Sequence, residues 1–600
     1  MDSYDEYMRS ITILPMPEDY RAKAGEQPRG RSEGEGLCIR AARGSFVQLN
    51  IAVTPPQNTI LIVEQRPAFL ARTPVDAVGV LRAKLDSAPF PGRIFAAEAV
   101  TDDDGIAKAD VLTQAQQFVP AWNTAQLTCL VDVPEDAEPG TYHMTVRFYS
   151  HTMFYDERLA REICFTVQVA RTVIPRGTGR RFHLNLWQHV FNIARKAEVA
   201  AYTDEHVEAL RPYCKALGEL GCRYATVLLS DVPWAGQGAF TDFRNPSDLY
   251  EYNYVRVRRT AQGRFVCNFT FAEKYIALTR QYGVDQIMLT GLHGIWVKPK
   301  YGFGGLVSDW PDAIRVSYVD ESDGCIRFMR TRAEIEEYIG LIYQWLCDTG
   351  KLSCACLMGD EVNLPGKTEG WTEMLATLHQ LMPDLRMEWD NEPASMLSET
   401  YAGERIDVYT PGHDAWSQAT EEQRQALKAR IRSGGRLLWS TCCWPPLVNS
   451  FLCNALTEVR LHGLITEKLG MDGFLRWNYT VWPEDPRGNL PLNGWPAGDT
   501  CFVYPGRGGQ CLLSLRYLAL RRGIEDFELC QMVKDRCENG REIIDKALDC
   551  VLVEPDMARW DYETWNEADR RRYFSGSCED FERARTILLD ALEGGNQDDL

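Results

Sequence analysis

An alternation of short apolar strands with longer amphipathic helices runs through residues 182–534 of this 600-residue chain and constrains its fold more than any other feature. Eight segments have the length and residue content of buried strands. They cover residues 182–189, 224–230, 286–292, 355–360, 386–390, 407–410, 436–440 and 473–479. Helical patterns fall between most of them, over residues 203–220, 271–282, 332–348, 371–381 and 421–433. Eight such units predict a (β/α)8 TIM-type barrel with long inserted loops.

The sequence before the barrel has a different rhythm. Short alternating runs separated by turn residues cover 46–53, 59–63, 128–133, 142–149 and 163–169. Strands at this spacing without helical periodicity predict an Ig-like β-sandwich. We therefore expect a multidomain α/β protein with a β-sandwich over residues 1–175, a catalytic (β/α)8 barrel over 180–535 and a short helical C-terminal extension over 536–600.

Charge and hydropathy exclude several classes of function. Asp and Glu outnumber Lys and Arg by 84 to 65, which gives a net charge of −19 and disfavours nucleic acid as a partner. No apolar run approaches the roughly 18 residues that cross a bilayer, and the acidic N-terminus is unlike a signal peptide. We expect a cytoplasmic protein with no membrane partner, whose oligomeric state the sequence leaves open.

Cysteine and histidine give no sign of a metal or cofactor. The 19 cysteines show no CxxC spacing, which favours reduced, mostly buried thiols. The nine histidines show no metal-ligand spacing. We therefore expect neither a metal nor a cofactor.

Aromatic, amide and carboxylate residues collect where the predicted strands end. In a barrel of this kind the active site lies at those C-terminal ends. Sugar rings combine apolar faces with polar edges, so stacking aromatics among hydrogen-bonding groups suit a saccharide. Any single strand aromatic belongs to the core more often than to a ligand site, at about two to one. The residues we expect to contact substrate are Trp187, His293, Trp389, Asp390, Tyr409, Trp439, Trp477 and Tyr479.

Asp360 and Glu361 form the sharpest candidate for chemistry, at the end of the fourth predicted strand. Neighbouring side chains in a strand point to opposite faces, so the two share a pocket only if the backbone turns there. Glycosidic cleavage needs one group to protonate the leaving oxygen and another to stabilise charge at the anomeric carbon. Consecutive carboxyls suit substrate assistance, in which the 2-acetamido oxygen of the sugar attacks. The alternative is a surface Asp-Glu dipeptide that caps the next segment.

Residues 472–528 resemble the C-terminal barrel region of glycoside hydrolase family 123 and its barrel relatives of formerly unknown function. The resemblance rests on the runs Asp472-Gly-Phe-Leu-Arg-Trp-Asn-Tyr479, Trp482-Pro-Glu-Asp-Pro, Gly498-Asp499, Tyr504-Pro-Gly506, Ser514-Leu-Arg516 and Arg522-Gly-Ile-Glu525-Asp526. It implies a retaining β-N-acetylgalactosaminidase that uses substrate-assisted catalysis. Asp360 would orient the acetamido group and stabilise the oxazolinium ion, and Glu361 would act as acid and then as base.

Two other readings stay open. One is a glycosidase of different sugar specificity on the same barrel, with Asp390, Asp414 or Glu484 set opposite Glu361. The other is a non-catalytic protein that binds glycans by aromatic stacking. All three readings give the protein a glycan or glycoside as its partner.

Overall fold

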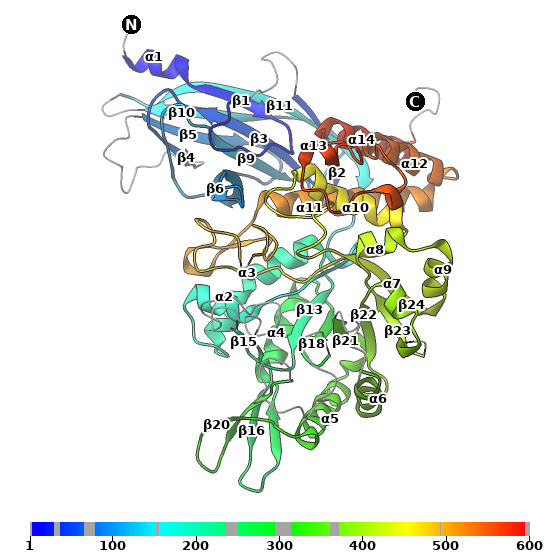
Figure 1. Ribbon diagram of the computed structural model, residues 1–600. Helices are drawn as coiled ribbons and strands as arrows, with labels where there is room; N and C mark the ends of the chain where they lie inside the picture. Colours follow the sequence, from blue (N-terminus) through cyan, green and yellow to red (C-terminus); the bar gives the residue numbers. More distant parts are fainter. Residues whose placement is uncertain are drawn as a thin grey trace.

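The computed structural model describes residues 3–28, 37–64, 79–151, 155–233, 250–293, 314–360, 371–401, 403–492 and 494–594. Figure 1 shows the β-rich N-terminal part (blue to cyan) above a barrel of parallel strands (cyan to yellow). The C-terminal helices, orange to red, lie beside the N-terminal part. No helix in these ranges combines the length and the apolar character that crossing a membrane requires.

The N-terminal β region comprises residues 3–173 and contains two sheets after the short helix α1 (Ser3–Ser10). The first sheet has the order β1 (Thr12–Met16), β3 (Phe46–Thr54), β9 (Ala125–Asp132), β6 (Gly92–Thr101), β7 (Ala107–Thr113). The second has the order β2 (Leu37–Arg43), β11 (Arg158–Val173), β10 (Gly140–His151), β5 (Gly79–Asp86), β4 (Thr59–Val63), β8 (Gln117–Val119). Ile51 and Leu127 of one sheet share a buried core with Val146 and Phe165 of the other. The β-rich region is confirmed, and its Ig-like topology stays a prediction.

Eight parallel strands form the barrel, which the hydrophobic pattern predicted. In spatial order they are β12 (His183–Leu186), β25 (Gly473–Arg476), β24 (Ile431–Ser440), β23 (Ile406–Tyr409), β22 (Arg386–Asp390), β21 (Ala355–Asp360), β18 (Gln286–Thr290) and β13 (Tyr224–Leu228). A single bridge between Leu184 and Cys222 brings β12 beside the start of β13. The barrel is therefore nearly closed.

Helices surround the barrel. They include α3 (Asp204–Leu220), α4 (Thr270–Gln281), α5 (Arg332–Asp348), α6 (Trp371–Leu381), α9 (Glu421–Arg430), α10 (Leu456–Leu469) and α11 (Leu515–Arg536). Thr331 and Glu334 form a capping box that starts α5. The helix expected over residues 421–433 ends earlier, at Arg430, because the following residues extend into β24 and include Gly434 and Gly435, which are poor helix formers.

A four-stranded sheet inserted into the barrel had no counterpart in the sequence analysis. It has the order β17 (Phe265–Asn268), β16 (Arg256–Arg259), β19 (Ser317–Asp320), β20 (Ile326–Phe328). Its strands are only three or four residues long, so their alternation is too short to stand out. Figure 1 shows this sheet projecting from the barrel on the side opposite the N-terminal β region.

The C-terminal helices α12 (Gly540–Val551) and α14 (Cys578–Glu593) pack on α11. Helix α14 also contacts β11, where Glu593 accepts a hydrogen bond of 2.7 Å from the backbone N–H of Thr172. The end of the chain therefore holds the N-terminal β region against the barrel.

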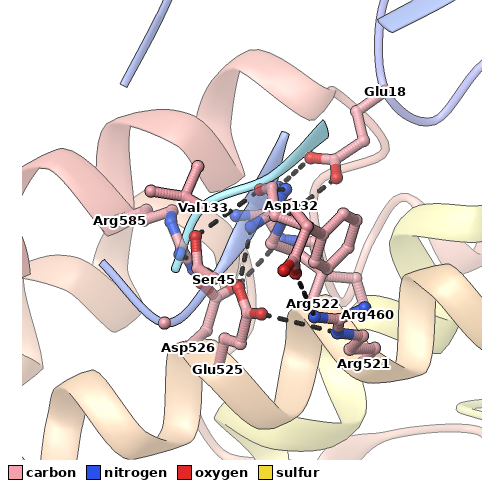
Figure 2. A network of polar contacts seen from close by, with 12 residues as sticks. Glu18, Ser45, Asp132, Val133, Arg460, Arg521, Arg522, Glu525, Asp526 and Arg585 are labelled. Carbon is pink, nitrogen blue, oxygen red and sulfur yellow. Dashed lines mark hydrogen bonds and ion pairs between the residues drawn. The ribbon is translucent and has the colours of Figure 1, made fainter. Parts of the chain in front are cut away.

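A buried arginine network strengthens this junction (Figure 2). We use that name for Glu18, Arg460, Arg522, Glu525, Asp526 and Arg585. Arg522 of α11 pairs with Glu18, which follows β1, at 2.9 Å and with Glu525 at 2.8 Å. Asp526 pairs with Arg460 of α10 at 2.7 Å and with Arg585 of α14 at 2.5 Å. Charges from four separate segments thus neutralise one another inside the protein.

Candidate active site

The strands β21 and β22 end at the same level of the barrel. Asp360 is the last residue of β21, and its Cα is paired in register with that of Asp390, the last residue of β22. Adjacent strands lie about 4.8 Å apart, so the backbone places two acidic residues at neighbouring strand ends. Glu361 lies outside the described residues, as does the side chain of Asp360. The pairing of Asp360 and Glu361 in one pocket stays a prediction.

One layer below Asp390, the carboxyl group of Glu388 points into the barrel. It accepts a hydrogen bond of 3.3 Å from the amide of Asn185 on β12, four strands away across the lumen. It also accepts one of 3.1 Å from the hydroxyl of Thr410, which follows β23. Both bonds end on Oε1, and Oε2 has no hydrogen-bond partner among the described residues. Sequence analysis missed this residue.

Burial decides the protonation of Glu388. The side chain is fully buried, and loss of solvent raises its pKa to about 8, against smaller lowering effects from Thr410, Asn185 and Arg386. At neutral pH the group is therefore mostly a carboxylic acid, which can donate as well as accept a hydrogen bond. A raised carboxyl pKa within a barrel lumen is typical of a functional site, although structural groups show it too.

Asp390 and Trp477 lie at the open face of the barrel. Asp390, at the end of β22, accepts a hydrogen bond of 3.3 Å from the hydroxyl of Ser440 at the end of β24. The strand β23 lies between these two strands. Trp477, which follows β25, is half-buried and contacts Trp495 edge to face at 4.8 Å. Its indole N–H donates to Asp499 at 3.4 Å, and Asp499 is fixed by Arg476 at 2.6 Å. The ion pair therefore orients an accessible aromatic ring.

Four of the expected contact residues are fully buried on the outer side of the barrel wall. The Trp439 indole donates to Thr466 of α10 at 2.7 Å, and Tyr409 packs against Trp416 of α8 (His413–Gln418). Trp389 and Tyr479 donate to the backbone carbonyls of Arg405 and Tyr213. Strand alternation sends Trp389, Tyr409 and Trp439 toward the helices. Tyr479 lies three residues after the end of β25 and reaches α3 instead, so all four side chains support the wall and do not face the opening.

Trp187 and His293 are also buried. Burial lowers the pKa of His293 to about 3, so the ring is neutral, and it meets the edge of Trp389 at 5.8 Å. A Cβ on Gly359 would lie 2.8 Å from the Trp389 ring and 3.3 Å from His293. The glycine therefore lets these two rings pack against the strand that carries Asp360.

The alternative glycosidase hypothesis also named Asp414 and Glu484. Asp414 lies in the first turn of α8 and is half-buried, and Glu484 is exposed in the loop after β25. One group of possible metal ligands occurs within the described ranges, formed by Glu18, Cys578 and Glu582. Both carboxylates there pair with Arg460, so an arginine already supplies the positive charge.

Comparison with known proteins gives two findings. The family model described as the glycoside hydrolase 123 catalytic domain matches residues 187–533, more than half of the chain. A family 123 glycoside hydrolase from Clostridium perfringens, studied for hydrolysis of glycolipid glycans, has a similar structure with a TM-score of 0.69. Sequence identity is 14%, and the match covers 98% of this chain and 99% of that one. The shared fold therefore includes the N-terminal β region.

A second solved structure among the matches is less similar. A monomeric β-xylosidase from Caulobacter crescentus CB15 has 13% identity and a TM-score of 0.33, covering 58% of this chain and 69% of its own. No curated protein matches the chain.

Proposed function

Because this chain belongs to glycoside hydrolase family 123 and is a glycoside hydrolase, we propose that it releases terminal β-linked N-acetylgalactosamine with retention of configuration. One observation carries the proposal: Asp360 ends β21, inside the matched residues 187–533, and Glu361 follows it directly. Acidic residues at the C-terminal ends of barrel strands lie where TIM-barrel enzymes hold their catalytic groups.

In the proposed reaction the substrate supplies its own nucleophile. Asp360 accepts a hydrogen bond from the acetamido N–H and so orients the carbonyl oxygen toward the anomeric carbon. That oxygen attacks as the glycosidic bond breaks, while Glu361 donates a proton to the leaving oxygen. Glu361 then takes a proton from water, which attacks the oxazolinium ion and restores the acetamido group. Two displacements at one carbon retain the configuration.

Residues around the strand ends have supporting roles in this proposal. The exposed part of the Trp477 ring offers an apolar face to the sugar, and Asp390 offers an acceptor to a sugar hydroxyl. Neutral Glu388 below them binds Asn185 and Thr410 without adding a further negative charge beneath Asp360 and Asp390.

The Clostridium perfringens protein hydrolyses glycolipid glycans, and we extend that substrate class to this chain as part of the proposal. An exo-acting enzyme needs only the terminal sugar in its pocket, so a lipid-linked glycan and a soluble aryl glycoside are expected to react at the same site. A soluble substrate therefore tests the chemistry without a lipid surface.

The strand register also favours a second candidate mechanism. Asp360 and Asp390 are paired on adjacent strands, and carboxyl groups about 5 Å apart suit direct displacement by an enzyme nucleophile. Such an enzyme would not need an N-acetyl group on its substrate. Hydrolysis of a β-galactoside as fast as the N-acetylated sugar would favour this mechanism.

The test is fluorophore release from aryl β-N-acetylgalactosaminide, with the β-N-acetylglucosaminide and β-galactoside beside it. We expect the first to react fastest and the Asp360→Asn variant to lose most of this rate. Equal rates on all three sugars, or an unchanged Asp360→Asn rate, would contradict the proposal. Glu208→Gln, on the exposed outer face of α3, is the control variant.

A further inference from the structure

A cleft of about 600 Å³ lies between the N-terminal β region and the outer helices of the barrel. Residues of β6 and β9 form one wall, and residues of α3 and α11 form the other. The segment that connects β11 to β12 crosses one end of it. None of its lining residues belongs to the C-terminal strand ends, so the cleft is separate from the candidate active site.

The cleft is positively charged in a protein whose net charge is −19. Five basic residues line it, against the two acidic residues Asp132 and Glu219. The basic residues are Arg93, Arg176, Arg180, Lys215 and Arg521. Asp132 is already paired with Arg176 at 2.9 Å and lies 3.9 Å from Arg521. Arg93 and Lys215, on opposite walls, are exposed and have no ion-pair partner in the part of the chain that the structure describes.

Arg180 is the most unusual of these groups, because it is buried to 99% and has no carboxylate partner among the described residues. Its Nε donates to the carbonyl of Pro175 at 3.2 Å, and Nη1 donates to that of Leu220, at the end of α3, at 2.6 Å. These carbonyls fix the guanidinium, while Nη2 donates to none of the described residues. Glu525 and Glu528 act on this cation only from beyond ion-pair distance, and burial still lowers the pKa of Arg180. Burying a charge without a direct ion pair is costly, and an anion in the cleft would supply that pair.

The wall beside these cations is apolar. Phe95, Leu130, Leu513 and Tyr282 are half-buried and pack against the main core. Flat apolar surface next to charged donors suits a sugar ring that carries an acidic group. The volume suits a ligand of disaccharide to trisaccharide size, and not a nucleic-acid duplex.

We propose that this cleft is a second binding site, which takes an acidic oligosaccharide. Arg180, Arg93 and Lys215 bind its carboxylate or sulfate, and Phe95 and Tyr282 contact its ring. The choice of a sugar rests on the chain being a glycoside hydrolase, but binding here does not depend on which bond the strand ends cleave. The cleft would hold an acidic region of a glycan while another region is hydrolysed.

Isothermal titration calorimetry with a sulfated chondroitin disaccharide tests the proposal on the full chain. The cleft variant is Arg93→Ser combined with Lys215→Gln, which keeps Arg180 and its structural hydrogen bonds. The matched control is Arg264→Ser combined with Lys546→Gln, which removes the same charge at exposed positions outside the cleft. Lactose and inorganic sulfate separate the contributions of the neutral ring and of the anion alone.

We expect the disaccharide to bind the wild type and the control variant equally and the cleft variant about tenfold more weakly. Binding should weaken with added salt, and lactose and inorganic sulfate should each bind more weakly than the disaccharide. Equal affinity in the cleft and control variants would overturn the proposal, since the ligand would then lie elsewhere. Absence of binding, or inorganic sulfate binding as tightly as the disaccharide, would also overturn it.

Discussion

The barrel lumen and the arginine network both bury carboxyl groups, but they treat them in opposite ways. In the lumen, burial raises the pKa of Glu388 to about 8, and no cation pairs with it among the described residues. In the network, burial also acts on Asp526, yet Arg460 and Arg585 outweigh it and hold its pKa below the ordinary value. Burial alone therefore does not set the charge of a carboxyl group in this protein.

This difference distinguishes residues that stabilise the fold from residues that lie near the candidate catalytic groups. The network neutralises every charge it buries and joins α10, α11 and α14 to the segment after β1 (Figure 2). The lumen keeps a carboxylic acid with one oxygen unpartnered among the described residues, directly below the strand ends. We expect changes in the network to alter stability, and changes at the strand ends to alter catalysis.

The largest expected effect is on catalysis. Replacing Glu361 by Gln removes the proposed acid and base, and kcat/KM on the aryl β-N-acetylgalactosaminide should fall about 10²- to 10⁴-fold. The thermal unfolding midpoint should stay within about 1 °C of the wild type, because the substitution removes no packing group and should change stability only slightly. A fall in the midpoint that accounts for the lost activity would place Glu361 among the supporting residues instead.

The network should give the reverse result. Asp526→Ala removes the buried carboxylate that Arg460 and Arg585 share, and leaves Arg460 with Glu18 and Glu582 and Arg585 with Glu525. We expect the free energy of unfolding to fall by about 3–5 kcal/mol, as when one partner of a buried ion pair is removed. Urea unfolding measures this, with Glu208→Gln in the exposed pair with Arg211 as control, where the loss should stay below about 1 kcal/mol. The folded fraction of Asp526→Ala should keep a wild-type KM. An altered KM would contradict the account, because it would mean that the arginine network also shapes the substrate site.

The pH dependence of stability should distinguish the lumen. The pKa of Glu388 is raised, so between about pH 4.5 and 8 the folded protein keeps a proton that the unfolded chain releases. Stability contributed by this group is therefore lost as pH rises, by up to about 1.4 kcal/mol per pH unit. The side chain of the Glu388→Gln variant cannot ionise. The thermal unfolding midpoint of this variant should therefore rise relative to that of the wild type as the pH is increased from 5 to 8. A difference that stays constant with pH would mean that Glu388 is ionised when folded.

The smallest expected effect concerns Trp477 at the open face of the barrel. Trp477→Ala removes a half-buried ring, and KM should rise about fivefold with kcat nearly unchanged, a loss of about 1 kcal/mol. Trp122→Ala, at an exposed tryptophan of the N-terminal β region, is the matched control and should leave KM unaltered. Equal effects of the two substitutions would remove Trp477 from the proposed substrate site.

The strands of the barrel could be predicted because their apolar runs are continuous. The expected segments 355–360 and 386–390 coincide with β21 and β22, and the six other barrel strands overlap their predictions. It was harder to predict from the sequence which side of the barrel wall each side chain faces. Trp389 and Trp439 lie one residue from Asp390 and Ser440, and alternation turns them toward the helices. The same alternation, counted two residues back from Asp390, would have found Glu388.

The arginine network could not be predicted, because its partners are far apart in the chain. Glu18 and Arg522 are 504 positions apart and meet only after the N-terminal β region packs on α11. The family resemblance had drawn on Arg516, Arg522, Glu525 and Asp526. In the structure Arg516 pairs with Asp110 of β7 at 3.0 Å, and the other three belong to the network. Much of the motif thus describes support for the barrel and not its chemistry.

Inhibition by an oxazoline mimic of N-acetylgalactosamine tests the central claim most directly, since only an enzyme that uses the acetamido group should bind it tightly. We predict competitive inhibition of aryl β-N-acetylgalactosaminide hydrolysis, with an inhibition constant well below KM that rises about 100-fold in Asp360→Asn. Active enzyme that the mimic does not inhibit would contradict substrate assistance at Asp360 and favour direct displacement.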